Sequence, residues 1–136
     1  MVTIEIGYEG ELHCRAQHGP SGATIETDAP VDNHGKGEAF SPTDLCASSL
    51  GVCMLTIFGI AADKHGVDVC GAKGVVTKEM SADLPRRIAR ITVDFEVPMP
   101  ADHPKRATLE AAAMNCPVHH SIHPDIEKVV NWNWVG

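Results

Sequence analysis

The sequence lacks clustered positive charge and has few basic residues in total. Its 136 residues include 11 Lys and Arg against 18 Asp and Glu, so its formal net charge at pH 7 is −7. The nearest approach to a basic cluster is Arg86-Arg87 followed by Arg90. Nucleic acids and anionic membrane surfaces attract clustered Lys and Arg. We therefore expect neither nucleic acid nor a membrane as a partner.

Features of secretion are also missing. The first residues, Met1-Val2-Thr3-Ile4-Glu5, have neither the basic start nor the apolar run of a signal peptide. This start predicts a cytoplasmic location. The five cysteines are an odd number, and structural disulfides are rare in a reducing compartment. We interpret the thiols as buried hydrophobes, ligands or reagents rather than as a covalent framework.

Long hydrophobic runs are scarce. The one candidate is the uncharged stretch from Leu45 to Ala62, whose 18 residues reach the lower limit for a membrane span. It contains Ser48, Ser49 and Thr56, and neither end shows a bias toward Lys and Arg. We predict a buried helix of a soluble protein.

The order of predicted elements indicates an α+β fold in a single domain, residues 1–136. Alternating apolar residues and turn signals predict strands at 2–8, 11–18, 23–27, 69–80, 88–97 and 128–134. The first three strands form an antiparallel meander. Helices are predicted from 42 to about 64, from 105 to 114, and in a short segment that starts at 116. Trp132 and Trp134 alternate, so they share one face of the last strand.

The long helix has clear ends and an unusual surface. Ser41 is placed as its N-cap, Pro42 as its first residue, and Gly66 just beyond its last turn. Its apolar residues point in every direction, and a helix that is apolar all round must be covered on all sides. One small sheet covers only one face. We therefore predict an obligate homodimer in which a second copy supplies the remaining cover.

Two cysteines lie in different kinds of sequence. Cys53 is in the middle of the long helix, whereas Cys116 precedes Pro117 at a helix start. Unpaired N–H groups and the helix dipole favour a thiolate at such a start. A second thiol that folds against it points to cysteine redox chemistry.

The residues around both cysteines resemble the OsmC/Ohr family. The segments that carry the resemblance are Ser41-Pro42-Thr43-Asp44-Leu45, Ser49-Leu50-Gly51-Val52-Cys53 and Cys116-Pro117-Val118-His119. The resemblance implies antiparallel sheets packed around a long central helix in an intertwined homodimer. It also implies a thiol-dependent peroxidase that reduces organic hydroperoxides in oxidative stress defence. Cys53 would be the peroxidatic thiol and Cys116 the resolving thiol.

The family's peroxidases activate their thiol with an Arg and with a Glu directly after the helix-starting Pro. This chain has Thr43 at that position and Asp44 one place later, a rotation of about 100° around the helix. Arg15 is the only Arg near the first hairpin. Asp44 and Arg15 are thus the candidate activating residues, and the departure from Glu indicates a divergent branch.

The implied reaction needs no cofactor and no resident metal. A thiolate attacks the O–O bond of a small hydrophobic peroxide, the sulfenic acid condenses with the second thiol, and an external thiol or dithiol reduces the disulfide. Cys14, Cys46 and Cys70 are assigned structural roles. An alternative is a non-catalytic dimer that binds a small hydrophobic ligand or a metal. The metal ligands would be Cys116, His119, His120 and His123.

Overall fold

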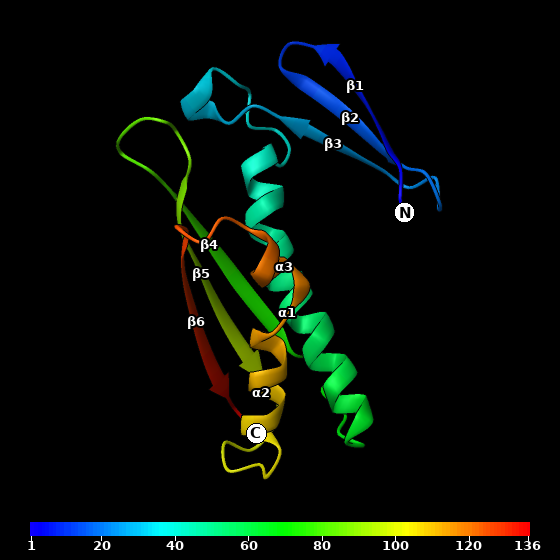
Figure 1. The fold of residues 1–136 in the computed structure, drawn as a ribbon, viewed down its shortest axis with the longest axis vertical. Coiled ribbons are helices and arrows are strands. Elements are labelled where there is room, and N and C mark those ends of the chain that lie inside the picture. Colours follow the sequence, from blue (N-terminus) through cyan, green and yellow to red (C-terminus); the bar gives the residue numbers. More distant parts are fainter. The chain divides into compact units, whose positions relative to one another are not determined.

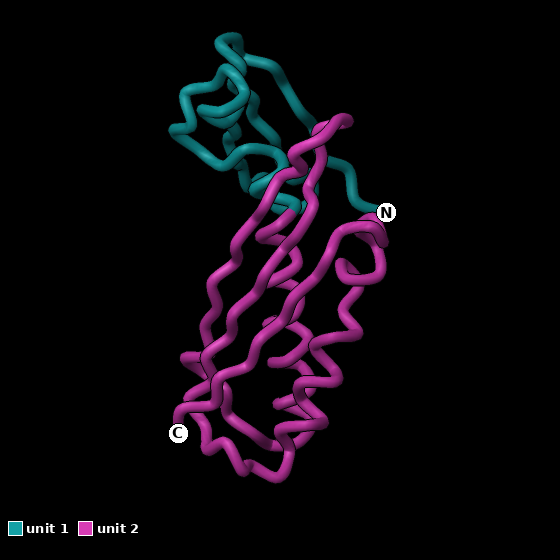
Figure 2. The backbone as a smooth tube through the Cα atoms, turned by 90° about the vertical axis from the view of Figure 1, so that its left-hand side faces the viewer, with its two compact units in different colours: residues 1–46 teal, residues 47–136 magenta.

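The computed structural model describes all 136 residues, which form two compact units (Figure 2). Unit 1 comprises residues 1–46 and unit 2 comprises residues 47–136. The long helix α1 (Pro42–Lys64) begins in unit 1 and continues into unit 2. The single domain expected from the sequence therefore stays a prediction.

Unit 1 contains the antiparallel meander that the sequence predicts. Its strands β1 (Ile4–Gly10), β2 (His13–His18) and β3 (Thr24–Asp28) pair in chain order (Figure 1), and the short 3-10 helix η1 (Val31–Asn33) follows. Glu11 and Leu12 connect β1 to β2 with φ angles of 52° and 63°. Positive φ at both turn residues matches the twist of the flanking strands, as in a type I′ hairpin.

The unit 1 sheet is apolar on one face and charged on the other. Ile6 pairs with Ala16, and Tyr8 pairs with Cys14, so these side chains share a face. Ile6 is 82% exposed and Tyr8 is 66% exposed. The opposite face carries the charged residues, among them Arg15. The apolar face of this sheet lacks full cover within the chain.

Helix α1 begins and ends as predicted. The Asp44 N–H donates to Ser41 Oγ at 3.0 Å, and the Ser41 N–H donates to Asp44 Oδ2 at 2.9 Å. This reciprocal pair satisfies two N–H groups at the helix start. At the other end Gly66 adopts a φ of +65°, and the Val67 N–H reaches the Ala62 carbonyl at 2.9 Å. Such a left-handed residue closes many helices.

Unit 2 contains the second sheet and two further helices. Its strands are β4 (Lys73–Met80), β5 (Ile88–Val97) and β6 (Glu127–Trp134), and its helices are α2 (Arg106–Met114) and α3 (Pro117–Ser121). Strands β4 and β5 are antiparallel, but β6 runs parallel to β5. The α+β class is confirmed, while the purely antiparallel pairing expected for this sheet is wrong. Helices α2 and α3 form the crossover that parallel strands require.

Strand β4 begins at Lys73, four residues later than the predicted start at Val69. The segment before it turns instead, because Asp68 Oδ1 accepts the Cys70 N–H at 2.9 Å and Gly71 has a φ of +93°. A short polar side chain that bonds to the backbone two residues on competes with strand pairing. Apolar alternation alone does not reveal that competition.

The core of unit 2 lies between α1 and the sheet. A single stripe of α1 is buried: Ala47, Leu50, Gly51, Met54, Phe58 and Ala62. The Phe58 ring stacks on Trp132 with centroids 5.1 Å apart, and Trp132 stacks on Phe95 at 4.4 Å. Trp134 meets Phe58 edge-on at 6.0 Å. The two tryptophans therefore share a face, as their alternation predicts.

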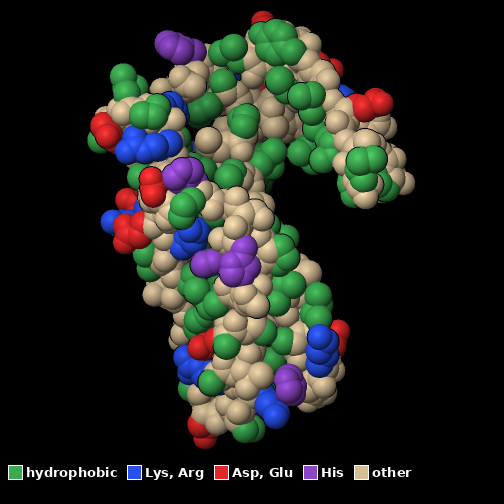
Figure 3. Space-filling view, viewed as in Figure 1, with side chains coloured by type: hydrophobic (Ala, Val, Ile, Leu, Met, Phe, Trp, Pro, Cys, Tyr) green, Lys and Arg blue, Asp and Glu red, His purple; other side chains and the backbone are tan.

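The other side of α1 remains apolar and uncovered by the chain. Val52 is 65% exposed and Ile60 is 48% exposed. Figure 3 shows hydrophobic side chains at the surface in both units. By length and composition alone, α1 could cross a membrane. Its buried stripe packs on aromatic side chains of unit 2, which is the behaviour of a core helix.

The stacked aromatic core yields a test of the fold. Replacement of Phe58 by Ala should lower the free energy of unfolding by about 3–5 kcal/mol, because a fully buried ring leaves a cavity. Leu84→Ala is the control, because Leu84 is 87% exposed and its loss should cost no more than about 0.5 kcal/mol. Urea unfolding at one protein concentration measures both. Equal costs for the two variants would contradict this packing.

Candidate active site

The structure brings together two of the predicted site residues, Cys53 and Cys116. Cys53 projects from α1 and Cys116 precedes α3, and the two thiols are close enough for Cys53 to raise the pKa of Cys116. Both are free cysteines. Cys116 is 0% exposed, whereas Cys53 is half-buried. A reagent that enters this site therefore meets the sulfur of Cys53 more easily than that of Cys116.

The local sequence explains the position of Cys116. Its backbone is extended, with φ −77° and ψ 151°, and Pro117 starts the helix directly after it. The His119 N–H donates to the Cys116 sulfur at 3.3 Å. The thiol thus takes the place of the Ser or Asp side chain that commonly caps a helix. This cap holds the sulfur in one position.

Burial decides the protonation of Cys116. Burial raises the pKa of the Cys116 thiol, and the hydrogen bond from the His119 backbone opposes that effect only in part. The neighbouring Cys53 thiol raises the pKa of Cys116 further. The expectation that this helix start favours a thiolate is therefore wrong in direction, because withdrawal from water outweighs the donated hydrogen bonds. Cys116 is held as a neutral thiol.

The histidines after Cys116 do not form one helical face. Helix α3 ends at Ser121, so His123 lies outside it. His120 Nε2 is 2.5 Å from Asn115 Oδ1. The pKa of His119 is lowered, first by burial and then by the charge of Lys128, which favours the neutral imidazole. Of the four candidate metal ligands, Cys116 is the N-cap, His119 and His120 lie in α3, and His123 lies beyond its end.

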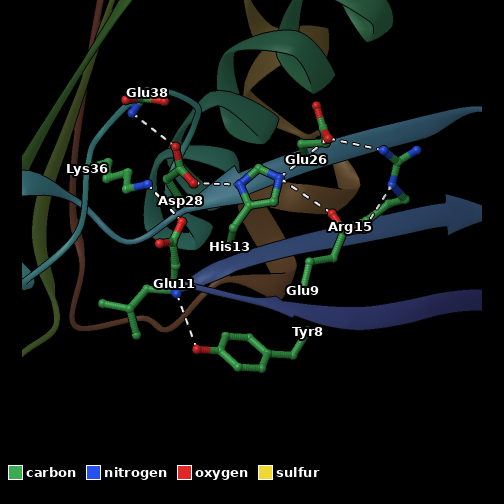
Figure 4. Close-up of polar contacts among 10 residues, drawn as sticks. Tyr8, Glu9, Glu11, His13, Arg15, Glu26, Asp28, Lys36 and Glu38 are labelled. Carbon is green, nitrogen blue, oxygen red and sulfur yellow. Dashed lines mark hydrogen bonds and ion pairs between the residues drawn. The ribbon is translucent and has the colours of Figure 1, made fainter.

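Arg15 and Asp44 each have partners inside unit 1. Arg15 Nη2 donates to Glu26 Oε1 at 3.1 Å, and its Nε lies 3.7 Å from Glu9 Oε2 (Figure 4). Asp44 caps α1 and precedes Cys53 by nine residues, a rise of about 13.5 Å along the helix. That distance excludes direct contact between the two side chains within one helix. Activation of Cys53 by either residue stays a prediction.

The remaining cysteines are distributed through both units. Cys70 is exposed and Cys46 is half-buried. Cys14 lines an apolar cavity of about 400 Å³ in unit 1, together with Ile6, Tyr8, Ala16 and Ile25 among others. The volume falls in the range of small-ligand sites. Periodicity predicts the apolar face but not the hollow in it, because a cavity depends on side chains from several elements.

A protein-family model identifies the family of this chain. The family model described as OsmC-like protein matches residues 35–130. The chain therefore belongs to the OsmC-like family, which confirms the resemblance seen in the sequence. Among curated protein sequences, none matches the chain.

Solved structures agree with this assignment. A Psychrobacter arcticus protein, provisionally described as osmotic stress induced and detoxification response protein, is 46% identical, with a TM-score of 0.91 over 97% of this chain and 96% of that one. The OsmC-like protein of Mycoplasma pneumoniae is 17% identical, with a TM-score of 0.82 over 100% and 98% of the two chains. The organic hydroperoxide resistance protein OhrB of Bacillus subtilis is 13% identical, with a TM-score of 0.70 over 97% of each chain. The last two establish similarity of fold alone.

The buried thiol can be titrated. The ultraviolet absorbance of thiolate, followed against pH in the wild type and in Cys116→Ser, gives a difference curve that reports the lost thiol. Because burial raises the pKa of Cys116, the midpoint of that curve should lie above the ordinary cysteine range. Cys70→Ser is the control for the loss of one thiol, because Cys70 is exposed and lies outside this site. A midpoint for Cys116 below the ordinary cysteine range would show that the N–H groups outweigh burial.

Proposed function

We propose that this protein is a thiol-dependent peroxidase that reduces organic hydroperoxides through Cys53 and Cys116. The observation that supports the proposal is the pair of neighbouring free thiols, one half-buried and one fully buried. Membership of the OsmC-like family and fold similarity to organic hydroperoxide resistance proteins add to it. The reaction would serve oxidative stress defence in the cytoplasm.

The reaction balances with these two thiols and an external reductant. The Cys53 thiolate attacks one peroxide oxygen, an S–O bond forms, the O–O bond breaks, and the alkoxide leaves as an alcohol after it takes a proton. The Cys116 thiol then attacks the Cys53 sulfenic acid, and its proton leaves with the hydroxyl group as water. The resulting disulfide is reduced by exchange with an external thiol or dithiol.

The difference in burial supports the proposed roles of Cys53 and Cys116. Cys53 is the more accessible sulfur, so it meets the peroxide. Cys116 is held as a neutral thiol, which suits a residue that waits for the sulfenic acid and does not compete for peroxide. The apolar stripe that flanks Cys53 on α1 favours an alkyl peroxide over hydrogen peroxide. Arg15 and Asp44 remain the candidates for promoting ionisation of Cys53.

Thiol counting tests the reaction. Reduced protein treated with one equivalent of cumene hydroperoxide should lose two of its five thiols and release the corresponding alcohol. Cys53→Ser should abolish peroxide consumption, whereas Cys116→Ser should leave a Cys53 sulfenic acid that dimedone traps. Cys70→Ser should behave as the wild type. If peroxide persists while both thiols stay reduced, the proposal is wrong.

We further propose that the working form is a homodimer. Val52 and Ile60 lie two turns apart on the uncovered side of α1, and Ile6 and Tyr8 lie on the uncovered face of the unit 1 sheet. Large exposed apolar surfaces of this kind mark association sites. A second copy of the chain would cover the exposed side of α1 and the apolar face of the unit 1 sheet. It would do so with its own copies of these two surfaces.

Oligomeric state can be measured directly. Analytical ultracentrifugation should show a dimer for the wild type. Val52→Asp should shift the protein toward monomer, because it places a charge in the apolar contact. Leu84→Asp is the control, because Leu84 is exposed in the β4–β5 turn. A monomeric wild type, or equal dissociation of both variants, would contradict the dimer.

A second candidate function is the binding of a small hydrophobic ligand. The observation that favours it is the apolar cavity of about 400 Å³ in unit 1. Native mass spectrometry of the untagged protein would detect a retained ligand. A stoichiometric ligand together with thiols that do not react with peroxide would support binding over catalysis.

A further inference from the structure

The loop between β3 and α1, residues 29–40, is closed at its neck. The Asp28 N–H donates to the Phe40 carbonyl at 3.1 Å, and the Gly37 N–H donates to the Ala29 carbonyl at 3.3 Å. A compact surface loop whose ends meet in this way is an Ω-loop, a class that is frequently functional. Asp28 thus lies where the chain leaves the sheet and where the loop returns to it.

The side chain of Asp28 joins the returning loop to the sheet. Asp28 is only 5% exposed. Its Oδ1 lies 2.6 Å from Nδ1 of His13 on β2, and its Oδ2 accepts the Glu38 N–H at 3.1 Å (Figure 4). One carboxylate therefore bridges the middle strand of the sheet and the end of the loop. Loss of the His13 contact would leave a buried carboxylate without one of its partners, which is costly.

Both ring nitrogens of His13 face carboxylates. On the side away from Asp28, Nε2 lies 3.4 Å from Glu26 Oε1 and 3.6 Å from Glu9 Oε1. A carboxylate only accepts hydrogen bonds, and a neutral imidazole has a single N–H, so only the protonated ring can donate on both sides. Hydrogen bonds with Asp28 and then with Glu26 raise the pKa of His13. The arrangement therefore selects the imidazolium.

Arg15 shares the two glutamates with His13. Its Nη2 donates to Glu26 Oε1 at 3.1 Å, and its Nε lies 3.7 Å from Glu9 Oε2. It has no printed contact with Asp28, whose oxygens are taken by the imidazole and by the Glu38 N–H. Asp28 thus depends on His13 for its charge partner in the sheet.

The loop adds charges of both signs beside Asp28. Lys36 Nζ donates to Glu11 Oε2 at 2.9 Å, and the charges of Glu38 and Asp28 also attract Lys36. Carboxylates, ammonium groups and guanidinium groups keep their charge between about pH 6 and pH 9. Among the charged groups on this face, His13 is therefore the one that titrates in that range.

We propose that His13 and Asp28 form a pH-dependent latch that holds the 29–40 loop closed and releases it at alkaline pH. The latch lies on the charged face of the unit 1 sheet, opposite the apolar face assigned to the dimer contact. It does not rest on the peroxidase proposal.

The direction of the pH effect follows from the two pKa changes. The pKa of His13 is raised, so its contribution is complete below the ordinary histidine value of about 6.5 and is lost as pH rises through the raised value. The hydrogen bond with His13 lowers the pKa of Asp28, so the carboxylate is lost only as pH falls through a value below the ordinary value of about 3.9. Near neutral pH, release therefore occurs on the alkaline side.

Limited proteolysis of the full chain tests the latch. Lys36 is 54% exposed, and trypsin cleavage after it tracks the population of the open loop. The rate is measured from pH 6 to pH 9, the cut is identified by mass spectrometry, and a peptide of residues 30–42 corrects for the protease's own pH dependence. The corrected rate should rise about tenfold for each pH unit that separates the His13 pKa in the closed loop from that in the open loop. The rise should coincide with the His13 titration followed by NMR.

Two variants separate the latch from general charge effects. His13→Gln should give a corrected rate that is independent of pH and as high as the alkaline rate of the wild type. His18→Gln is the matched control, because His18 is also on β2 but bonds to Ser21 outside the latch. It should keep the wild-type profile.

The wild-type measurements decide the proposal even if His13→Gln fails to fold by circular dichroism. The latch is overturned by a corrected rate that stays flat through the His13 titration, or by a His13 midpoint at or below the ordinary histidine range. It is also overturned if folded His13→Gln keeps the wild-type pH dependence, or if His18→Gln loses it.

Discussion

The packing of one stripe of α1 against the β4-β5-β6 sheet determines the geometry of unit 2. Phe58 is its anchor, because its ring contacts both Trp132 and Trp134. Gly51 permits the close approach: a Cβ there would lie 2.7 Å from a methyl group of Val76. Since one stripe must face the sheet, every other position on the helix is oriented by it. Cys53, two residues from Gly51, is thereby aimed at the start of α3.

The thiol pair illustrates how burial controls chemistry. A helix start and a donated N–H both favour a thiolate, yet Cys116 is withdrawn from water and its pKa rises. The same packing leaves Cys53 half-buried. One arrangement therefore separates a protected neutral thiol from a more accessible one. That separation, rather than the presence of two cysteines, supports the division of roles in the proposed reaction.

The unit 1 sheet uses its two faces differently. One face carries apolar side chains such as Ile6 and Tyr8, and the proposed dimer would bury it. The other face carries His13 and Arg15 with the carboxylates that pair with them. Both follow from the alternation of side chains along β-strands.

Local signals in the sequence determined much of the fold. Ser41 and Pro42 placed the start of α1, Gly66 placed its end, and alternation identified the strands. The long helix and the helix start at Pro117 singled out Cys53 and Cys116, and the family resemblance implied their roles. The sequence did not determine the parallel pairing of β6, because strand direction depends on how α2 and α3 cross over. It also did not predict that Glu9, His13 and Glu26 lie together, because they meet only after three strands align.

Cap residues and side-chain periodicity act between near neighbours along the chain, so the sequence alone reveals helices, strands and their faces. The protonation of Cys116, the approach of Cys53 and the hydrogen bonds of His13 depend on exclusion of water and on contacts between distant segments. Those quantities are properties of packing. Only the tertiary structure decided them.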